Sequence, residues 1–281
     1  YVDCTFGAGG YTKAILESND CKVVAIDQDP STEKYYQDFA KKYGKRICYI
    51  NDNFRNLKRV LSGFIPVDGL VYDLGVSSMQ LDEGERGFSF QQNAKLDMRM
   101  GTKGISAYEI VNEYNETHLA DIIYNYGGEG KSRKIAKKIV EARSISPINT
   151  TFELAKIVRS VCAKVSKIDP ATKTFQAIRI AVNDEIGSLE ESLAQIVDVL
   201  KIGGRVAIVS FHELEDRVVK QFFIKNSAPK VAVSKYAKHA QISDKPFKII
   251  TRKSIKPSYD EIRLNPRSRS ARLRVIEKVG A

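Results

Sequence analysis

Short apolar runs alternate with amphipathic stretches over the first third of the chain and again near its end. The apolar runs have the length of buried strands, and several of the stretches between them have helical periodicity. Strands are predicted just before Gly7 and at residues 22–26, 47–50, 68–73, 205–210 and 273–279. Strands that alternate with helices favour a parallel sheet covered on both faces. The pattern predicts an α/β fold of the doubly wound type.

The middle of the chain has a different pattern. Residues 106–181 have helical periodicity throughout, and Thr150 and Glu153 have the spacing of a capping box. We therefore expect residues 106–181 to form a helical domain inserted into an α/β domain made of residues 1–105 and 182–281. Residues 75–104 have neither helix nor strand periodicity, and a connection of that length is often functional. The polar, lysine-rich stretch 229–257 predicts a loop.

The first strand runs directly into Gly7, Gly9 and Gly10, and a helical segment follows. Such a turn lets backbone N–H groups approach a ligand closely. Asp27 ends the next strand, twenty residues past Gly7, where nucleotide-binding folds place the acid that holds a ribose hydroxyl. Thr12 stands in place of the third glycine of the dinucleotide fingerprint, which counts against NAD. A plain strand-to-helix turn is the alternative interpretation.

Polar residues end three predicted strands. Asp27 and Asp73 each end one, and the third leads into residues 51–53. In a doubly wound fold these ends face the ligand. Acids at such positions suggest a cationic or hydroxyl-rich ligand, and S-adenosylmethionine, with its sulfonium, amino group and ribose, fits that description. Phe54 follows the third strand and is expected either to pack on an adenine ring or to belong to the core.

Composition narrows the choice of partners. The chain has 281 residues, of which 43% are hydrophobic, and 45 Lys and Arg outnumber 34 Asp and Glu to give a net charge of +11. This excess favours a polyanion, nucleic acid first, although a lysine-rich proteome gives the same bias. The four cysteines and three histidines lack metal-site spacing, and no run is long enough to span a membrane. The chain begins almost directly in a strand, so we expect a further N-terminal segment to precede it.

Several stretches suggest contacts with nucleic acid. Residues 131–143 form a basic helical segment, and residues 265–274 form a basic tail before the last strand. Each predicts either a solvated surface or a phosphate-binding surface. In the long connection, Arg86 and Arg99 are expected to meet phosphates, and Phe88 or Phe90 to stack on an unpaired base.

Seven stretches together resemble the bacterial family that methylates N4 of a cytidine in small-subunit ribosomal RNA, the MraW or RsmH family, with its mitochondrial relatives. They are residues 3–10, 68–82, 86–90, 96–100, 173–183, 203–220 and 265–274. The resemblance implies a Rossmann-like, S-adenosylmethionine-dependent methyltransferase core with an inserted helical domain. It also implies S-adenosylmethionine as cofactor and ribosomal RNA as partner, naked or in an assembled subunit, with no membrane and no metal. The implied location is the bacterial cytoplasm, with the mitochondrial matrix as alternative.

The resemblance also implies site residues. The family's cofactor contacts would fall on Gly9, Gly10, Tyr11, Asp27, Phe54, Asp73 and Gln80. Three departures from the family pattern stand out. Tyr11 replaces a His, Glu213 replaces a Ser, and residues 126–130 replace a Tyr-Gly-Glu-Glu run. The first of these departures falls in the expected cofactor pocket.

The base pocket is less well defined, because the strand end at Asp73 lacks the Asn/Asp-Pro-Pro-aromatic loop that many amine methyltransferases use. We expect the 75–104 segment to replace it. Asp97 is the predicted catalytic residue, which accepts a hydrogen bond from the amine. Phe88 is predicted to stack on the base, and Arg99 and Arg179 to bind phosphate. Two other hypotheses remain open: an RNA-binding protein with a vestigial cofactor pocket, and an NAD-dependent dehydrogenase.

Overall fold

The computed structural model describes residues 1–162, 169–227 and 245–280. The chain divides into two compact units, one of Tyr1–Gly75 with Ile186–Ala281 and the other of Val76–Glu185. The second unit therefore begins earlier than residue 106, where the sequence analysis placed the start of the helical domain. The physical reason is apolar packing, because Leu96, Met98 and Met100 lie buried in the same core as the helices that follow.

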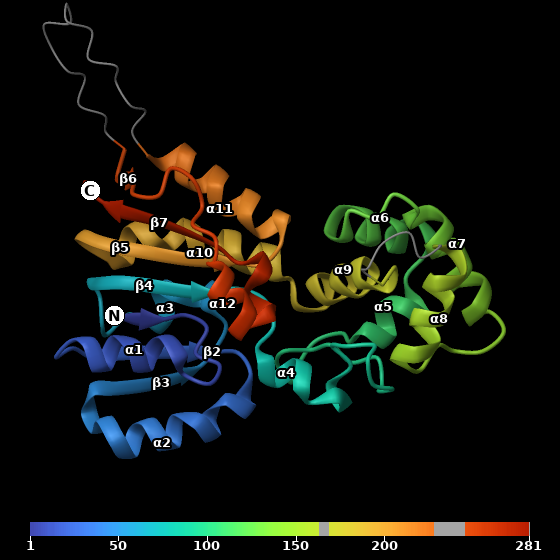
Figure 1. Ribbon diagram of the computed structural model, residues 1–281, viewed down its shortest axis with the longest axis horizontal. Coiled ribbons are helices and arrows are strands. Elements are labelled where there is room, and N and C mark those ends of the chain that lie inside the picture. Colours follow the sequence, from blue (N-terminus) through green and yellow to red (C-terminus); the bar gives the residue numbers. More distant parts are fainter. Residues whose placement is uncertain (163–168, 228–244, 281) are drawn as a thin grey trace, which may run out of the picture. The chain divides into compact units, whose positions relative to one another are not determined.

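The first unit is built on a seven-stranded sheet of order β3-β2-β1-β4-β5-β7-β6 (Figure 1). The strands are β1 (Val2–Asp3), β2 (Val23–Asp27), β3 (Ile47–Asn51), β4 (Val67–Asp73), β5 (Leu200–Ser210), β6 (Phe247–Ile249) and β7 (Arg272–Lys278). Strands β1 to β5 are parallel, whereas β7 runs antiparallel to both β5 and β6. The predicted α/β fold with a doubly wound, Rossmann-like sheet is confirmed.

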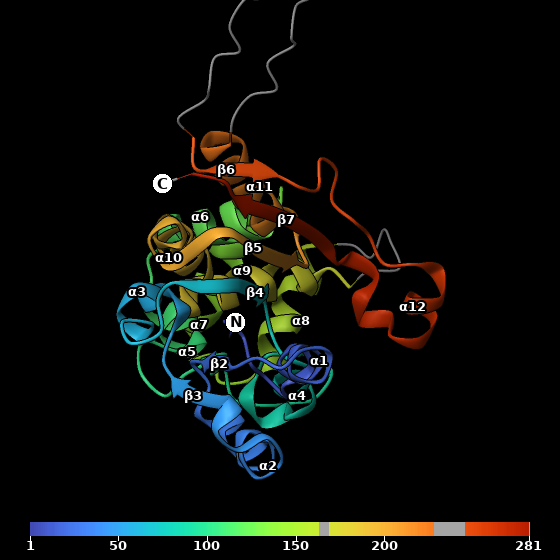
Figure 2. The same cartoon turned by 90° about the vertical axis from the view of Figure 1, so that its left-hand side faces the viewer.

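Helices cover both faces of this sheet. Successive strand residues point to opposite sides, so apolar strands have two apolar faces that must both be buried. In β2, Val24 and Ile26 belong to one apolar core, and Val23 and Ala25 belong to the other. The first core also takes residues from α3 (Leu57–Val60), α10 (Glu185–Val199) and α11 (Glu213–Asn226). The second takes them from α1 (Gly10–Ser18) and α2 (Glu33–Tyr43). Figure 2 shows α3 and α10 on one side of the sheet and α1 on the other.

One strand was not expected. β6 lies within residues 229–257, which were predicted to form a loop, and residues 228–244 of that stretch lie outside the described part. The strand pairs with β7, and Phe247 is 1% exposed. A run of three residues is too short for its periodicity to be read from sequence. Helix α12 (Tyr259–Leu264) and a short 3-10 segment (Pro266–Ser270) connect β6 to β7.

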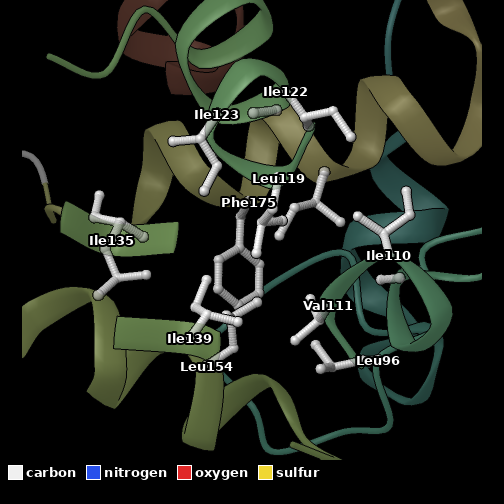
Figure 3. Packing of buried hydrophobic residues seen from close by; sticks show 14 of the residues in the cluster. Leu96, Ile110, Val111, Leu119, Ile122, Ile123, Ile135, Ile139, Leu154 and Phe175 are labelled. Atoms are coloured by element: carbon white, nitrogen blue, oxygen red, sulfur yellow. The ribbon is translucent and has the colours of Figure 1, made fainter. Parts of the chain in front are cut away.

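The second unit is helical, as predicted for residues 106–181. Its helices are α4 (Ser78–Asp82), α5 (Ala107–Glu113), α6 (Glu116–Gly127), α7 (Ser132–Arg143), α8 (Thr151–Val161) and α9 (Ala171–Asn183). Figure 3 shows the core that they enclose, where Phe175 lies among Leu119, Ile139 and Leu154. The predicted capping box of α8 is present, with the Thr150 hydroxyl and the Glu153 carboxylate bonded to each other's backbone.

The glycine turn between β1 and α1 has a conformation that its sequence requires. Gly9 has φ 81° and Gly7 has φ 51°, the left-handed region in which a side chain is strained. A Cβ on Gly9 would lie 2.6 Å from Cε2 of Phe39 and 2.9 Å from Cε2 of Phe6. Gly10, the first residue of α1, has open space within 4 Å of its Cβ position.

We predict that Gly9→Ala destabilises the protein by about 2 kcal/mol or more, through steric overlap and backbone strain. Gly10→Ala is the matched control, since Ala is favoured over Gly in a helix, and it should leave the free energy of unfolding unchanged or raise it slightly. Urea unfolding of both variants and the parent measures the difference. Equal stability of the two variants would contradict this account of the turn.

Candidate active site

Asp27 joins the glycine turn to the end of β2. Its Oδ2 accepts a hydrogen bond of 2.7 Å from the Gly7 N–H, and its Oδ1 accepts one of 2.9 Å from the Asp29 N–H. The spacing of twenty residues seen in the sequence therefore corresponds to a direct contact. Burial raises the pKa of Asp27 to about 6, because the charged form loses hydration. Each oxygen keeps a further lone pair for a hydroxyl group.

Asp3 and Thr12 form a buried pair that the sequence analysis did not identify. Both residues are 0% exposed. The Asp3 Oδ2 accepts hydrogen bonds from the Thr12 N–H at 3.1 Å and from its hydroxyl at 2.7 Å. The threonine that departs from the dinucleotide fingerprint thus ties α1 to the end of β1. The only sequence signal for this pair is an acid at a strand end followed nine residues later by a Thr. That pattern is too common to predict a contact by itself.

Asp73 ends β4 at the same edge of the sheet. Its backbone N–H donates to the Thr5 hydroxyl at 2.7 Å, which links the ends of β4 and β1. Burial, with the nearby charges of Asp3 and Glu215, raises the pKa of Asp73 to about 7. Its Oδ1 is buried and has no hydrogen-bond partner among the described residues. A buried carboxylate oxygen without a partner is costly, and a ligand that carries a donor or a cation would satisfy it.

Tyr11 and Phe54 complete the predicted cofactor residues of the first unit. The Tyr11 side chain is 38% exposed, and burial together with the charges of Asp73, Asp3 and Glu261 raises the pKa of its phenol. It therefore stays protonated and able to donate a hydrogen bond. Phe54 packs edge-on against Tyr72, with ring centroids 5.6 Å apart. It is partly buried, so its predicted contact with an adenine ring stays a prediction.

In the second unit, Asp97 and Arg99 form a bidentate ion pair. Arg99 donates from Nε to Asp97 Oδ1 and from Nη2 to Oδ2, each at 2.8 Å. These hydrogen bonds lower the pKa of Asp97. The carboxylate is consequently a persistent hydrogen-bond acceptor and a poor proton acceptor. The Asp97 and Arg99 side chains are 36% and 31% exposed.

The backbone around this pair is fixed by a residue that sequence reasoning missed. Asn183, at the end of α9, donates from its amide to the Met98 carbonyl at 2.7 Å and accepts from the Met100 N–H at 2.7 Å. Met98 has φ 61°, which is unusual for a residue with a side chain. Arg86 donates to the Arg99 and Met100 carbonyls at 2.9 and 3.0 Å. The segment is therefore held in one conformation from two sides.

Three predicted residues have other contacts in the structure. Phe88 is 8% exposed and lies in the core of the second unit, with Arg86 over its ring, so its predicted stacking on a base is not favoured. Arg179 forms a bidentate pair with Glu185 at 2.8 and 2.9 Å, and their side chains are 15% and 9% exposed. Its charge is neutralised, which disfavours the predicted phosphate contact. Gln80 is 6% exposed, and its Oε1 accepts from the Ser77 N–H in the capping box of α4.

The first unit thus has the features of a site for a nucleotide-like cation. A glycine turn, an acid that accepts a hydrogen bond from it, and a second acid with a buried oxygen that has no partner among the described residues lie at the carboxyl edge of a doubly wound sheet. This combination, with an antiparallel last strand, defines the class of Rossmann-like methyltransferases. The chain belongs to the MraW methylase family, whose sequence profile matches residues 1–279.

Named relatives are similar over nearly the whole length. The chain is 53% identical to "Ribosomal RNA small subunit methyltransferase H" of Rickettsia africae (strain ESF-5), over 99% of this chain and 92% of that protein. It is 54% identical to the protein of the same name in Rickettsia akari (strain Hartford), with the same coverage. Among the helices in the described ranges, none has the length and apolar character needed to cross a membrane.

The raised pKa of Asp73 predicts a pH-dependent cost in stability. Because the folded pKa is about 7 and the ordinary value is 3.8, the folded state binds more protons, and stability is lost as the pH rises through 7. Asp73→Asn should therefore raise the free energy of unfolding at pH 8 by about 2 to 4 kcal/mol, and the gain should vanish near pH 4.

Chemical denaturation across this pH range measures the effect. Asp20→Asn is the matched control, since the Asp20 side chain is fully exposed and should show no such pH-dependent gain. A parent and an Asp73 variant with parallel pH profiles would refute the assignment of the cost to this carboxylate.

Proposed function

We propose that this protein transfers a methyl group from S-adenosylmethionine to the exocyclic N4 amine of a cytidine in small-subunit ribosomal RNA. The observation that carries the proposal is the pair of partly buried acids Asp27 and Asp73 beside the glycine turn, each with a raised pKa. Membership of a methylase family and relatives named as small-subunit ribosomal RNA methyltransferases support the substrate class. The cytoplasm as location belongs to the same proposal.

The residues of the first unit suit S-adenosylmethionine in charge and in hydrogen-bonding capacity. Asp27 would accept hydrogen bonds from the ribose hydroxyls with the lone pairs that Gly7 and Asp29 leave available. The Asp73 Oδ1, buried and without a described partner, would lie toward the cationic part of the cofactor. Gly9 and Gly10 would let the backbone approach the cofactor closely, and Tyr11 would offer its phenol as a donor. Phe54 and Gln80 remain proposed contacts.

When bound, S-adenosylmethionine supplies a methyl group on a cationic sulfur: the amine nitrogen gains the methyl, the carbon–sulfur bond breaks, and one amine proton leaves. The protein contributes position and electrostatics, which supply most of the rate in a reaction of this kind. Asp97 would hold the amine through a hydrogen bond, because its lowered pKa keeps it ionised. It would orient the nitrogen and leave the proton to solvent.

Arg99 has a different proposed task from the one in the sequence analysis. Two of its nitrogens hold Asp97, and Nη1 lies 3.4 Å from the Gly104 carbonyl. Its main effect would therefore be to fix the direction of the Asp97 carboxylate. Among the described residues Nη1 has only that weak contact, so it keeps donors for a phosphate of the target nucleotide.

We predict that Asp97→Asn lowers kcat at least tenfold and leaves the affinity for S-adenosylmethionine unchanged. Steady-state methylation kinetics and calorimetric cofactor binding give the two values. The matched control is Asp121→Asn, which removes a carboxylate of the same unit that pairs with Arg133 on the surface at 2.7 Å, and it should methylate normally. Unchanged turnover in the Asp97 variant would remove this residue from the reaction.

The decisive experiment incubates the protein and methyl-labelled S-adenosylmethionine with small ribosomal subunits that lack the modification. Digestion of the RNA to nucleosides should place the label in N4-methylcytidine. Naked RNA in parallel reactions reports whether the assembled subunit is required. A protein that fails to bind the cofactor would refute the proposal and favour the vestigial-pocket hypothesis, and label in another nucleoside would refute the target.

A further inference from the structure

Residues 250–271 form a basic segment between the edge strand β6 and its neighbour β7. We call this segment the edge arm. It contains α12 and the 3-10 segment Pro266–Ser270. Six of its residues are basic and two are acidic, so it holds a large share of the chain's excess positive charge. The proposed reaction assigns no role to it.

The edge arm returns to the sheet at the edge where the candidate cofactor residues lie. Arg272, which follows it, pairs with Ser210 at the end of β5, and Val209 is in turn the partner of Asp73. Figure 2 shows α12 set off from the sheet on the side where α1 lies. Glu261 of α12 is also close enough to Tyr11 for its charge to act on the phenol.

The basic side chains of the arm are accessible. Arg252, Lys253, Lys256, Arg263 and Arg269 are all exposed. Within the described ranges, none of these five has an ion-pair or hydrogen-bond partner for its side chain. By contrast, most exposed basic residues of the neighbouring strands are paired, for example Arg205 with Glu277 at 2.7 Å. A cluster of unneutralised cations on one segment has the electrostatic character of a polyanion-binding surface.

Two arginines of the predicted basic tail differ from these exposed cations, because both are paired with a carboxylate. The basic tail 265–274 was considered as a phosphate track. Arg274 is 9% exposed and donates to both oxygens of Asp216, at 2.6 and 3.1 Å. Arg272 donates to the same carboxylate at 3.2 Å. These two arginines anchor β7 to α11. The accessible positive charge therefore lies in the arm and not at the end of the tail.

The arm has a defined conformation, which a binding surface requires. Ile255 of the arm and Leu273 of β7 exchange two backbone hydrogen bonds of 2.9 Å, which tie the arm to the sheet. The Ser258 hydroxyl caps α12 by accepting from the Glu261 N–H at 3.1 Å. The Ser268 hydroxyl donates to the Asn265 carbonyl at 2.8 Å, and Ser268 is 6% exposed. The cations are therefore displayed on a fixed scaffold at little further cost in entropy.

Exposed apolar side chains lie among these cations. Tyr259 is 81% exposed and Leu264 is 82% exposed, at the two ends of α12. An aromatic ring beside basic side chains is the combination that binds unpaired nucleotides, since the ring stacks on a base and the cations meet the phosphates. Charge alone would also fit an anionic membrane, but the exposed tyrosine favours RNA.

We propose that the edge arm is an RNA-docking surface that holds the phosphates and one unpaired base of the ribosomal RNA next to the cofactor residues. The inference rests on the proposed function for the identity of the RNA. The cofactor and the RNA carry opposite charges and would bind to different residues. The acids at the strand ends would bind the cationic cofactor, and the cations of the arm would bind the RNA phosphates at the same edge of the sheet.

The test compares two double variants of equal charge. Arg263→Gln with Arg269→Gln removes two arm cations, and Lys220→Gln with Lys225→Gln removes two exposed cations of α11. Fluorescence anisotropy with a small-subunit ribosomal RNA fragment measures affinity from 50 to 300 mM salt. The arm variant should bind at least tenfold more weakly at 100 mM salt, and its slope of log affinity against log salt should fall by about 1.5. The α11 variant should match the parent.

Tyr259 provides a second, charge-neutral test. Tyr259→Ala should weaken binding about tenfold with an unchanged salt slope, whereas Tyr259→Phe should bind like the parent because the ring is kept. Equal affinities for the parent, the arm variant and Tyr259→Ala would overturn the proposal. If the arm variant bound anionic vesicles more weakly than the parent but bound RNA equally well, the proposal would be wrong and the arm would be a membrane-binding surface.

Cofactor binding separates this inference from the proposed function. All variants should bind S-adenosylmethionine with the parent's affinity, because they leave the glycine turn, Asp27 and Asp73 intact. If the parent and the arm variant methylate small subunits with the same KM and kcat, the RNA-docking role of the edge arm is wrong and the proposed function stands. If the parent binds the RNA through the arm and transfers no methyl group, the proposed function is wrong and the docking surface stands.

Discussion

The first unit depends on hydrogen bonds that neighbouring backbone amides and a hydroxyl donate to carboxylates at the ends of β1 and β2. Asp3 binds the N–H and hydroxyl of Thr12, and Asp27 binds the N–H of Gly7. These bonds fix where α1 begins and hold the glycine turn against the end of β2. These bonds also favour the ionised form of both carboxylates, and so oppose the effect of burial, which raises the pKa of each.

Placing carboxylates in partly buried positions costs free energy of folding, and the rest of the unit offsets that cost. Burial raises the pKa values of Asp27 and Asp73 to about 6 and about 7, so ionisation near neutral pH works against folding. The sheet tolerates the cost because two apolar cores enclose it, with Tyr72, Ile26 and Leu57 fully buried. A cationic ligand would return part of this free energy on binding. Stability and ligand affinity therefore oppose each other at this edge.

Hydrophobic periodicity predicted the parallel strands and the helical middle of the chain, and the run of glycines after the first strand predicted the turn, because each has a strong local signal. Asp27 was found through its spacing from Gly7, which the structure shows as a hydrogen bond. Side-chain partners were harder to predict. Arg179 and Phe88 have the residue types of an RNA site, but Glu185 and the apolar core engage them. Asn183 holds the Asp97 segment from a distance of more than 80 residues along the chain, which no local pattern reveals.

The position of Phe39 has a consequence for how this sequence can vary. The space that a Cβ on Gly9 would need is filled by a ring from α2. The shape of the turn is thus set partly by a helix that is not expected to contact a ligand. A one-residue insertion in α2 would rotate that ring away and loosen the turn without altering any residue in it. Substitutions in α2 are therefore coupled to those in the turn, and the two segments should change together or not at all.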